Sequence, residues 1–363
     1  MQYDYLIVGA GFAGTVLARL VAEKHNAKVC IIDKRSHIAG NAFDCYNSDG
    51  ILIHQYGPHI FHTNHKKVWD FLSLYTAWHY FQHYVLTFID GKLLPMPINI
   101  NTINQLYGTN YNVFTIHEFF NKVKVNKKNI KTSEDIIISR IGVELFEKFF
   151  KNYTKKQWGV YPAALDKSVT ARIPIRENFD NRYFTDVYQG MPLHGYTKLF
   201  ENILKHPNIT VKLKTDFFKI KDSLLYKKLV YCGALDEFFN YKHGKLPYRS
   251  LDFQFKTYNQ EKYQNAPVVN YPNDYDFTRI TEYKYLTNQK HAKTTVSFEF
   301  SKSEGEPYYP IPTSENFNIV AKYQEEVSKL KDTLFIGRLA EYKYYNMDNV
   351  ILRAIEEFEK IKV

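Results

Sequence analysis

The stretch Tyr5–Gly14, YLIVGAGFAG, predicts how the first part of the chain folds. The apolar, β-branched run that precedes the glycines, residues 3–8, is typical of a buried parallel strand. It passes through Gly9-x-Gly11-x-x-Gly14 into a segment with helical spacing over residues 15–24. The first glycine allows a tight turn, the second admits a pyrophosphate, and the third lets helix and strand pack closely.

A second strand is predicted over residues 28–32, and it ends at Asp33. A carboxylate at this distance from the glycines accepts hydrogen bonds from ribose hydroxyls, while the helix N-terminus faces the phosphates. Strand, glycines, helix and acid together predict an adenine-dinucleotide site. The alternative is a glycine turn in an ordinary βαβ unit.

The composition narrows the function classes. The chain has 363 residues, a formal charge of +10 and three cysteines, and 17% of its residues are aromatic. The lysines are scattered and form no long basic tail, so nucleic-acid binding is disfavoured. Three widely spaced cysteines indicate no disulfide framework, and no run of about eighteen apolar residues occurs. We expect a protein of the cytoplasm without membrane insertion.

Histidines gather after a short strand predicted over residues 51–56. His59 and His62 have H-x-x-H spacing, and His54 and His65 lie near them. This spacing raises the question of a metal site. No Asp, Glu or Cys nearby completes a ligand set, so imidazoles beside a flavin are the favoured interpretation, and no metal is predicted.

The middle of the chain changes pattern twice. An amphipathic helix over 66–76 and a hairpin over 84–95 precede helical segments over 102–107, 117–125, 132–141 and 144–153. After a further helix over 195–204, alternating runs over 251–257, 268–271, 278–285 and 294–300 predict an antiparallel sheet. A buried strand over 333–336, Gly337 and a helix over 349–361 end the chain; such a helix N-terminus can stabilise charge on a reduced flavin.

Several longer motifs carry a resemblance to a known family. They are GAGFAG with KRSHIAGN, YGPHIFHTN from Tyr56, NYTKKQWG from Asn152, the segment from Arg172 to Gly190, GEPYYP from Gly305, and GRLAEYKYYNMD from Gly337. Together they resemble the UDP-galactopyranose mutase family over almost the whole chain.

The resemblance implies an α/β fold of three parts. The first is a Rossmann-like FAD-binding domain over 1–76, 195–245 and 320–363, and the second is an inserted helical domain over 98–175. An antiparallel sheet domain over 77–97, 176–194 and 246–319 is the third. It also implies a homodimer, and a mobile lid around Arg172.

The implied reaction interconverts UDP-galactopyranose and UDP-galactofuranose with no net redox change. In it, N5 of reduced FAD attacks sugar C1 and displaces UDP, and the ring opens through an iminium and recloses. A reductant such as NAD(P)H is needed to reduce the FAD.

The resemblance also assigns residues. The catalytic set is His59, His62, Arg172 and Arg338. The substrate set is Phe149, Phe150, Tyr153, Trp158, Arg172, Tyr183, Arg249, Asn270, Arg279, Tyr309, Arg338, Tyr344 and Asn346. The cofactor set is Gly9, Gly11, Phe12, Ala13, Gly14, Asp33, Lys34, Arg35, Gly40, Asn41, His59, Ile60, Gly337, Arg338, Tyr344, Asn346, Met347 and Asp348.

The chain departs from the family pattern at Ala39, where many members have glycine, at Pro58 in place of alanine, and at Asn346, which is Asp in some members. Three alternatives stay open at this point. One is a mutase for UDP-N-acetylgalactosamine, UDP-arabinose or dTDP-fucose. The others are a FAD-dependent oxidoreductase and a non-catalytic nucleotide-binding module.

Overall fold

A five-stranded parallel sheet holds the two ends of the chain together in the computed structural model, which describes residues 2–361. Its strand order is β10-β2-β1-β11-β17. The strands are β1 Tyr3–Val8, β2 Val29–Ile32, β10 Ile209–Lys212, β11 Tyr226–Tyr231 and β17 Thr333–Phe335. The predicted strand–glycine–helix–strand unit is confirmed, with β1 and β2 paired in parallel.

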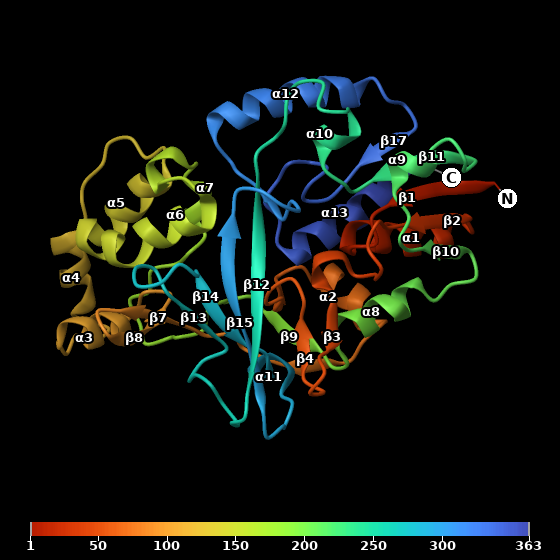
Figure 1. Cartoon of the computed structure of the whole chain (residues 1–363). Coiled ribbons are helices and arrows are strands. Elements are labelled where there is room, and N and C mark those ends of the chain that lie inside the picture. The colour runs from red at the N-terminus through yellow and green to blue at the C-terminus, as the bar shows by residue number, and fades with distance from the viewer. Residues whose placement is uncertain (1, 362–363) are drawn as a thin grey trace.

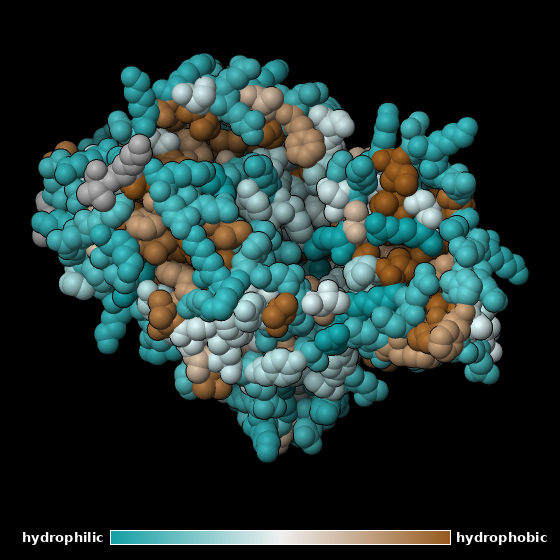
Figure 2. Space-filling model, turned by 180° about the vertical axis from the view of Figure 1, so that it is seen from behind, coloured by the Kyte–Doolittle hydropathy of each residue, from teal (hydrophilic) through white to brown (hydrophobic). Residues whose placement is uncertain are grey.

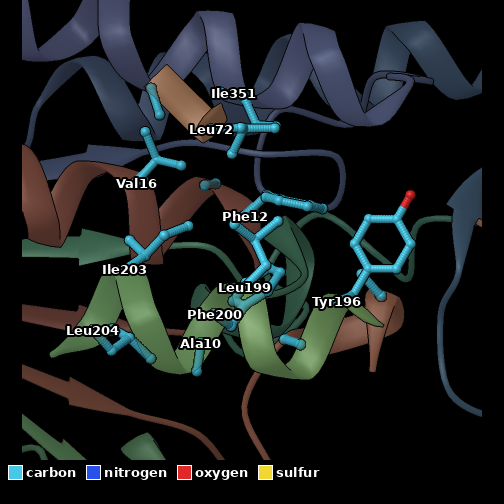
Figure 3. Packing of buried hydrophobic residues seen from close by; sticks show 14 of the residues in the cluster. Ala10, Phe12, Val16, Leu72, Tyr196, Leu199, Phe200, Ile203, Leu204 and Ile351 are labelled. Carbon is cyan, nitrogen blue, oxygen red and sulfur yellow. The ribbon is translucent and has the colours of Figure 1, made fainter. Parts of the chain in front are cut away.

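Helices cover both faces of this sheet. On one face lie α1 Phe12–Lys24, α2 Lys66–Ser73, α8 Gly195–Leu204 and α13 Met347–Lys360. Figure 3 shows Phe12 and Val16 of α1 packed among Leu199, Phe200 and Ile203 of α8, Leu72 of α2 and Ile351 of α13. On the other face lie α9 Phe217–Ile220, α10 Leu235–Phe238 and α12 Ser314–Ser328. A sheet buried on both faces explains why the central strands β1 and β2 are almost continuously apolar.

A seven-stranded sheet forms the centre of the molecule, between the parallel sheet and the helical lobe (Figure 1). Its order is β16-β12-β15-β14-β13-β7-β8, and only the β13–β7 pair is parallel. The strands are β7 Val85–Ile89, β8 Lys92–Met96, β12 Tyr248–Tyr258, β13 Val268–Asn270, β14 Arg279–Glu282, β15 Thr294–Lys302 and β16 Tyr309–Pro310.

The strand predicted over 278–285 is wrong at its end. β14 stops at Glu282, and the chain turns into the short helix α11, Tyr283–Thr287. Tyr283 and Leu286 are fully buried in the core of the nucleotide-binding lobe. Their three-residue spacing suits a helical turn, whereas a continued strand would point them to opposite faces.

The helical lobe comprises α3 Ile100–Tyr107, α4 Ile116–Val123, α5 Ser133–Phe146, a π-helical turn Glu147–Lys151, α6 Asn152–Trp158, a 3₁₀ turn Pro162–Ala164 and α7 Ser168–Ala171. The predicted break between two helical segments near residues 141–144 lies at Gly142, whose φ is +79°. A side chain there would sit 2.2 Å from the Val123 carbonyl oxygen, so glycine lets α4 and α5 approach closely.

Two small sheets and a 3₁₀ turn, Gly40–Ala42, complete the fold. β3 Asp44–Tyr46 pairs with β4 Leu52–His54, and β9 Tyr188–Pro192 lies between β5 Phe61–Thr63 and β6 Trp78–Tyr80. β6 and β9, which the expected domain boundaries group with the large sheet, pair with β5 of the nucleotide-binding lobe. The expected boundary at position 320 falls inside α12.

The surface is mostly hydrophilic on the side seen in Figure 2, with separate apolar spots and a hollow between the two lobes. Over residues 2–361, no helix combines the length and the apolar character needed to cross a bilayer.

Candidate active site

The first of two cavities lies beside the glycine loop that joins β1 to α1. It is lined by most residues of the predicted cofactor set, namely Gly9, Gly11, Phe12, Ala13, Gly14, Asp33, Lys34, Arg35, Gly40, Asn41, His59, Gly337, Arg338 and Met347. Gly9 has a φ of +110°, and a side chain on Gly14 would lie 2.2 Å from the Gly9 carbonyl oxygen. The loop thus brings its backbone to the cavity wall in a form that only glycines permit. We call this space the cofactor cavity.

Asp33 fixes the glycine loop from the end of β2. One carboxylate oxygen accepts from the Ala10 amide and the other from the Arg35 amide, each at 2.9 Å. A carboxylate oxygen accepts more than one hydrogen bond, so Asp33 retains capacity for a ribose hydroxyl. Ala39 takes a φ of +73° and donates to the Ala10 carbonyl oxygen. This departure from glycine therefore keeps the left-handed turn that the loop requires.

The second cavity lies between the helical lobe and the seven-stranded sheet. Predicted substrate residues line it from three parts of the chain, namely Phe149, Phe150, Tyr153, Trp158, Arg172, Tyr183, Asn270, Arg279, Tyr309, Arg338, Tyr344 and Asn346, together with His59 and His62. This lining contains three guanidinium groups, those of Arg172, Arg279 and Arg338, and a single carboxylate, that of Glu299. The excess positive charge favours an anionic ligand, and arginine suits phosphate. We call this space the substrate cavity.

Tyr344 lies among the three arginines. The Arg172 and Arg338 guanidinium carbons lie 4.9 Å and 5.5 Å from the centre of its ring, and Arg172 Nη2 donates to its hydroxyl at 3.3 Å. Burial opposes ionisation of this phenol, but Arg172, Arg338 and Arg279 together lower the pKa of Tyr344. Tyr344 thus provides an aromatic face for two cations that would otherwise repel each other.

The arginines differ in how they are held. Arg279 Nε and Nη2 donate to Glu299 at 3.1 Å and 3.0 Å, and the Arg338 side chain donates to the carbonyl oxygens of Tyr308 and Tyr345. Among residues 2–361, Arg172 donates only to the Tyr344 hydroxyl and to the Val169 carbonyl oxygen. Arg279 and Arg338 are therefore parts of the framework, whereas Arg172 contributes little to it.

The aromatic end of the substrate cavity comes from the π-helical turn and α6. Phe149 and Phe150 are buried, and the Tyr153 hydroxyl donates to the Asn270 side chain at 3.3 Å. Trp158 packs edge-on against Tyr309, with ring centres 5.0 Å apart. Rings at these positions offer flat faces of the kind on which a nucleobase stacks.

The two cavities meet at a shared wall of five residues, Asn41, His59, Tyr308, Arg338 and Met347. His59 Nδ1 lies 2.8 Å from the Gly57 carbonyl oxygen and donates to it, which leaves Nε2 as an acceptor. Burial, aided by His54 and Arg338, lowers the pKa of His59 to about 3, so its imidazole is neutral at physiological pH. α13 begins at this wall with Met347.

His62, the second histidine of the H-x-x-H pair, is held by Phe184 and Asp186. Its Nδ1 lies 3.0 Å from Asp186 Oδ2, and its ring stacks on Phe184 with centres 3.6 Å apart. The hydrogen bond from His62 lowers the pKa of Asp186. Among residues 2–361 no group of three or more His, Cys, Asp or Glu side chains forms a possible metal site.

Comparison with known proteins identifies the family. A family model described as UDP-galactopyranose mutase matches residues 148–344, and one described as NAD(P)-binding Rossmann-like domain matches residues 7–74. A probable UDP-galactopyranose mutase of Klebsiella pneumoniae is 38% identical over 97% of this chain and 93% of its own length. The chain belongs to the UDP-galactopyranose mutase family. It is therefore an enzyme of the isomerase class.

Two further relatives of this mutase have names that differ in the sugar. A UDP-galactopyranose mutase of Mycoplasma genitalium is 37% identical over 99% of this chain and 95% of its own length. A dTDP-fucopyranose mutase of Escherichia coli is 38% identical over 97% and 96%. A crystal structure of reduced UDP-galactopyranose mutase superimposes with a TM-score of 0.78 at 16% identity, covering 99% of this chain and 95% of that one. This last likeness concerns the fold alone.

Some residues assigned to sites in this mutase lie elsewhere. Arg249 lines neither cavity; its guanidinium donates to the carbonyl oxygens of Lys156 and Gln157 at the end of α6. Asp348 is buried, accepts from the Thr63 hydroxyl at 3.2 Å and lines neither cavity. Ile60, Tyr344 and Asn346, expected at the cofactor, line only the substrate cavity.

Sequence reasoning also missed residues in the mutase cavities. Tyr56, His83, Thr87, Gln157, Glu299 and Tyr308 line the substrate cavity without having been assigned to it. Residues 81–89 alternate between buried and partly buried positions, and His83, Val85 and Thr87 share the buried face. Polar residues at buried positions of an alternating strand were the signal that could have found two of them.

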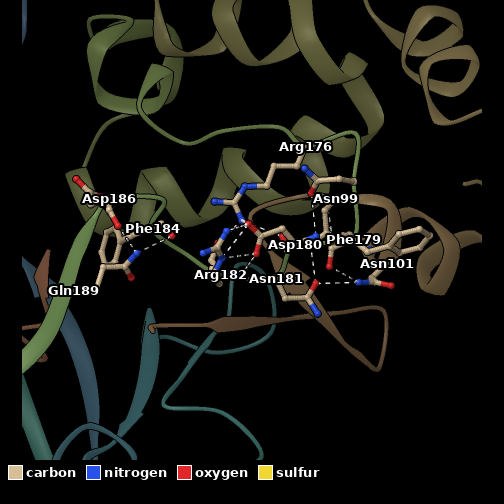
Figure 4. Close-up of polar contacts among 12 residues, drawn as sticks. Asn99, Asn101, Arg176, Phe179, Asp180, Asn181, Arg182, Phe184, Asp186 and Gln189 are labelled. Atoms are coloured by element: carbon tan, nitrogen blue, oxygen red, sulfur yellow. Dashed lines mark hydrogen bonds and ion pairs between the residues drawn. The ribbon is translucent and has the colours of Figure 1, made fainter. Parts of the chain in front are cut away.

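The segment that follows Arg172, expected to be a lid, is fastened to the helical lobe at its far end. Asn99 and Asn101 donate to the Asn181 side-chain oxygen, and Arg182 forms a paired contact with Asp180 (Figure 4). Arg176, which is 7% exposed, donates to the carbonyl oxygens of Asp180 and Arg182. None of these contacts near residues 180–182 involves Arg172.

Proposed function

We propose that this enzyme interconverts UDP-galactopyranose and UDP-galactofuranose, with FAD in the cofactor cavity and the nucleotide sugar in the substrate cavity. The observation that carries the proposal is the shared wall, where the glycine-loop cavity meets a cavity rich in arginine. A reaction between a bound cofactor and the sugar of a diphosphate needs this adjacency.

The cofactor cavity fits FAD at both of its ends. The glycine loop and the first turn of α1 offer backbone N–H groups to a pyrophosphate, and Asp33 lies at the end of β2 for a ribose. At the other end, α13 begins at the shared wall, where a helix N-terminus stabilises negative charge. Reduced FAD would supply, at N5, the nucleophile that displaces UDP from C1 and keeps the sugar bound while its ring opens and recloses.

The arginines of the substrate cavity would stabilise the leaving group. Negative charge on the diphosphate grows as the bond to C1 breaks, so contacts from Arg172, Arg279 and Arg338 strengthen toward the transition state. Tyr183 and Tyr344 would add hydroxyl donors to the phosphates. The Tyr309 hydroxyl donates to the Gln157 carbonyl oxygen at 3.0 Å and would have to rotate away from it to do the same. Phe149, Phe150, Tyr153 and Trp158 would hold the uridine at the aromatic end, with Asn270 beside it.

His59, His62 and Asn346 would position the sugar at the shared wall. The neutral His59 imidazole can accept a sugar hydroxyl through Nε2 without adding a positive charge. Asn346 precedes α13, but its side chain does not cap the helix, which leaves the amide available to the cavity. An amide binds hydroxyls as donor and acceptor but does not act as a base.

A second candidate is isomerisation of dTDP-fucopyranose. It is favoured by the Escherichia coli relative, which is as similar to this chain as the Klebsiella pneumoniae relative is. UDP-N-acetylgalactosamine and UDP-arabinose have no such support among the relatives described. The two nucleotide sugars differ in the base, in the 2′-hydroxyl of the ribose and in the 6-hydroxyl of the sugar, so a direct comparison of both substrates separates the candidates.

The test is incubation of purified protein with UDP-galactofuranose, with and without dithionite, followed by chromatography of the products. We expect a yellow protein that forms UDP-galactopyranose only when reduced. Conversion in the absence of reductant, or a protein that binds UDP but no flavin, would refute the proposal. Conversion of dTDP-fucofuranose alone would favour the second candidate.

A further inference from the structure

Two buried polar groups, His83 just before β7 and Thr87 within it, have no hydrogen-bond partner. His83 is 4% exposed and Thr87 is 2% exposed, and the His83 Nδ1 and the Thr87 hydroxyl are unpaired. Seven residues within 2–361 carry a buried side-chain atom of this kind, and only these two line the substrate cavity. A buried polar group without a partner is costly, so a ligand that pairs with it gains affinity.

These two groups belong to a row of alternate side chains that lines the substrate cavity. His83, Val85 and Thr87 line it, whereas Tyr84, Leu86 and Phe88 do not. This is the alternation of an extended backbone, which continues from His83 into β7, and four extended residues span about 13 Å. A ligand lying along β7 would meet one polar group, then an apolar side chain, then the second polar group.

The surroundings of each group indicate which part of a ligand it meets. Thr87 is the register partner of Asn270, which accepts from Tyr153 at the aromatic end. The His83 ring lies 5.9 Å from the Phe184 ring, which in turn stacks on His62. Thr87 therefore lies at the expected nucleoside end, and His83 lies near the imidazole expected to contact the sugar.

We propose that His83 determines sugar specificity by hydrogen-bonding the 6-hydroxyl of galactose, while Thr87 hydrogen-bonds the nucleoside; this rests on the proposed function. In the proposed function the reacting C1 would face the shared wall. His83 lines the substrate cavity outside that wall, so it would reach the sugar from another side. The 6-hydroxyl is carried on an arm off the ring and extends farthest from it. A 6-deoxy sugar would leave His83 unpaired and be rejected.

The experiment compares UDP-galactofuranose with its 6-deoxy analogue in the reduced, flavin-loaded enzyme. The native enzyme is expected to prefer the hydroxylated sugar in kcat/KM by roughly 5- to 150-fold, the range for leaving one buried group unpaired. His83→Phe keeps a flat ring without nitrogen atoms. We expect it to remove most of this preference and to leave UDP affinity within about 2-fold of native.

Two further variants keep the test decisive. His83→Asn restores a donor and an acceptor, and is expected to recover part of the preference; flavin content and Tm show that each variant folds. Thr87→Val is expected to weaken UDP binding roughly 5-fold or more and to affect both sugars equally. If His83→Phe lowers kcat/KM equally for both sugars, or if the native enzyme favours the 6-deoxy sugar, the proposal is overturned.

Binding measurements separate failure of this inference from failure of the proposed function. If the native enzyme converts neither sugar, the proposed function fails. The same two nucleotide sugars then serve as ligands in calorimetry, and the ratio of their dissociation constants for native and His83→Phe protein gives the same comparison. A ratio near one for native protein overturns the inference.

Discussion

Replacement of Arg172 by alanine tests the proposed diphosphate site with little damage to the fold. Within the described part of the chain, its guanidinium donates only to the Tyr344 hydroxyl and the Val169 carbonyl oxygen. Removing Arg279, in contrast, would leave Glu299 buried without its ion pair. A hydrogen bond to a charged group contributes about 1.5–3 kcal/mol. We therefore expect Arg172→Ala to weaken UDP binding by about 10- to 150-fold.

The loss in kcat/KM should exceed the loss in UDP affinity. Charge on the diphosphate grows in the transition state, where one preorganised donor contributes about 2.7–4 kcal/mol, or a factor of about 100 to 1,000. Calorimetric titration with UDP and initial rates under reducing conditions measure the two quantities. Arg182→Ala removes the same charge from the same segment outside both cavities and is the matched control. Equal losses in the two variants would refute the assignment of Arg172.

Three further predictions concern the cofactor loop, the fastened segment and the sugar site. Gly14→Ala should weaken FAD binding by about 10- to 100-fold, because the added methyl lies 2.2 Å from the Gly9 carbonyl oxygen, whereas Gly50→Ala, with open space around it, should not; fluorescence titration of the apoprotein decides. The contact with Arg182 lowers the pKa of Asp180 to about 2, so this pair stabilises the fold above pH 4 and is lost as pH falls from about 4 to about 2. Asp180→Asn should therefore be less stable than native at pH 7, with the difference vanishing near pH 2, and a pH-independent difference in denaturant unfolding would contradict this. Asn346→Asp should keep appreciable activity, and complete loss with folding intact would count against its sugar-binding role.

Local patterns explain what could be predicted from the sequence. The strand, glycine loop, helix and acid over residues 3–33 lie within one βαβ unit, where every requirement is met by near neighbours. The helix predicted over 195–204 has the same bounds as α8, because its apolar positions keep helical spacing. The resemblance rests on whole motifs, and most of the site residues that it assigned line one of the two cavities.

Contacts between distant segments explain the rest. α12 was not expected, although Thr313 accepts from the Asn316 amide as a helix cap and Val320 and Tyr323 are spaced for one buried face. Arg249 has the chemistry of a phosphate ligand, but the end of α6 lies beside it in space and takes its hydrogen bonds. No local pattern reveals such a partner, because α6 lies in another lobe.

The most direct test of the account is a crystal structure of the protein with FAD and UDP bound. We predict the UDP diphosphate within hydrogen-bonding distance of Arg172 and Arg338, the uracil among Phe149, Phe150 and Tyr153, and the flavin ring against the shared wall at His59 and Met347. A UDP molecule bound outside the substrate cavity, or a flavin ring directed away from that wall, would contradict the account.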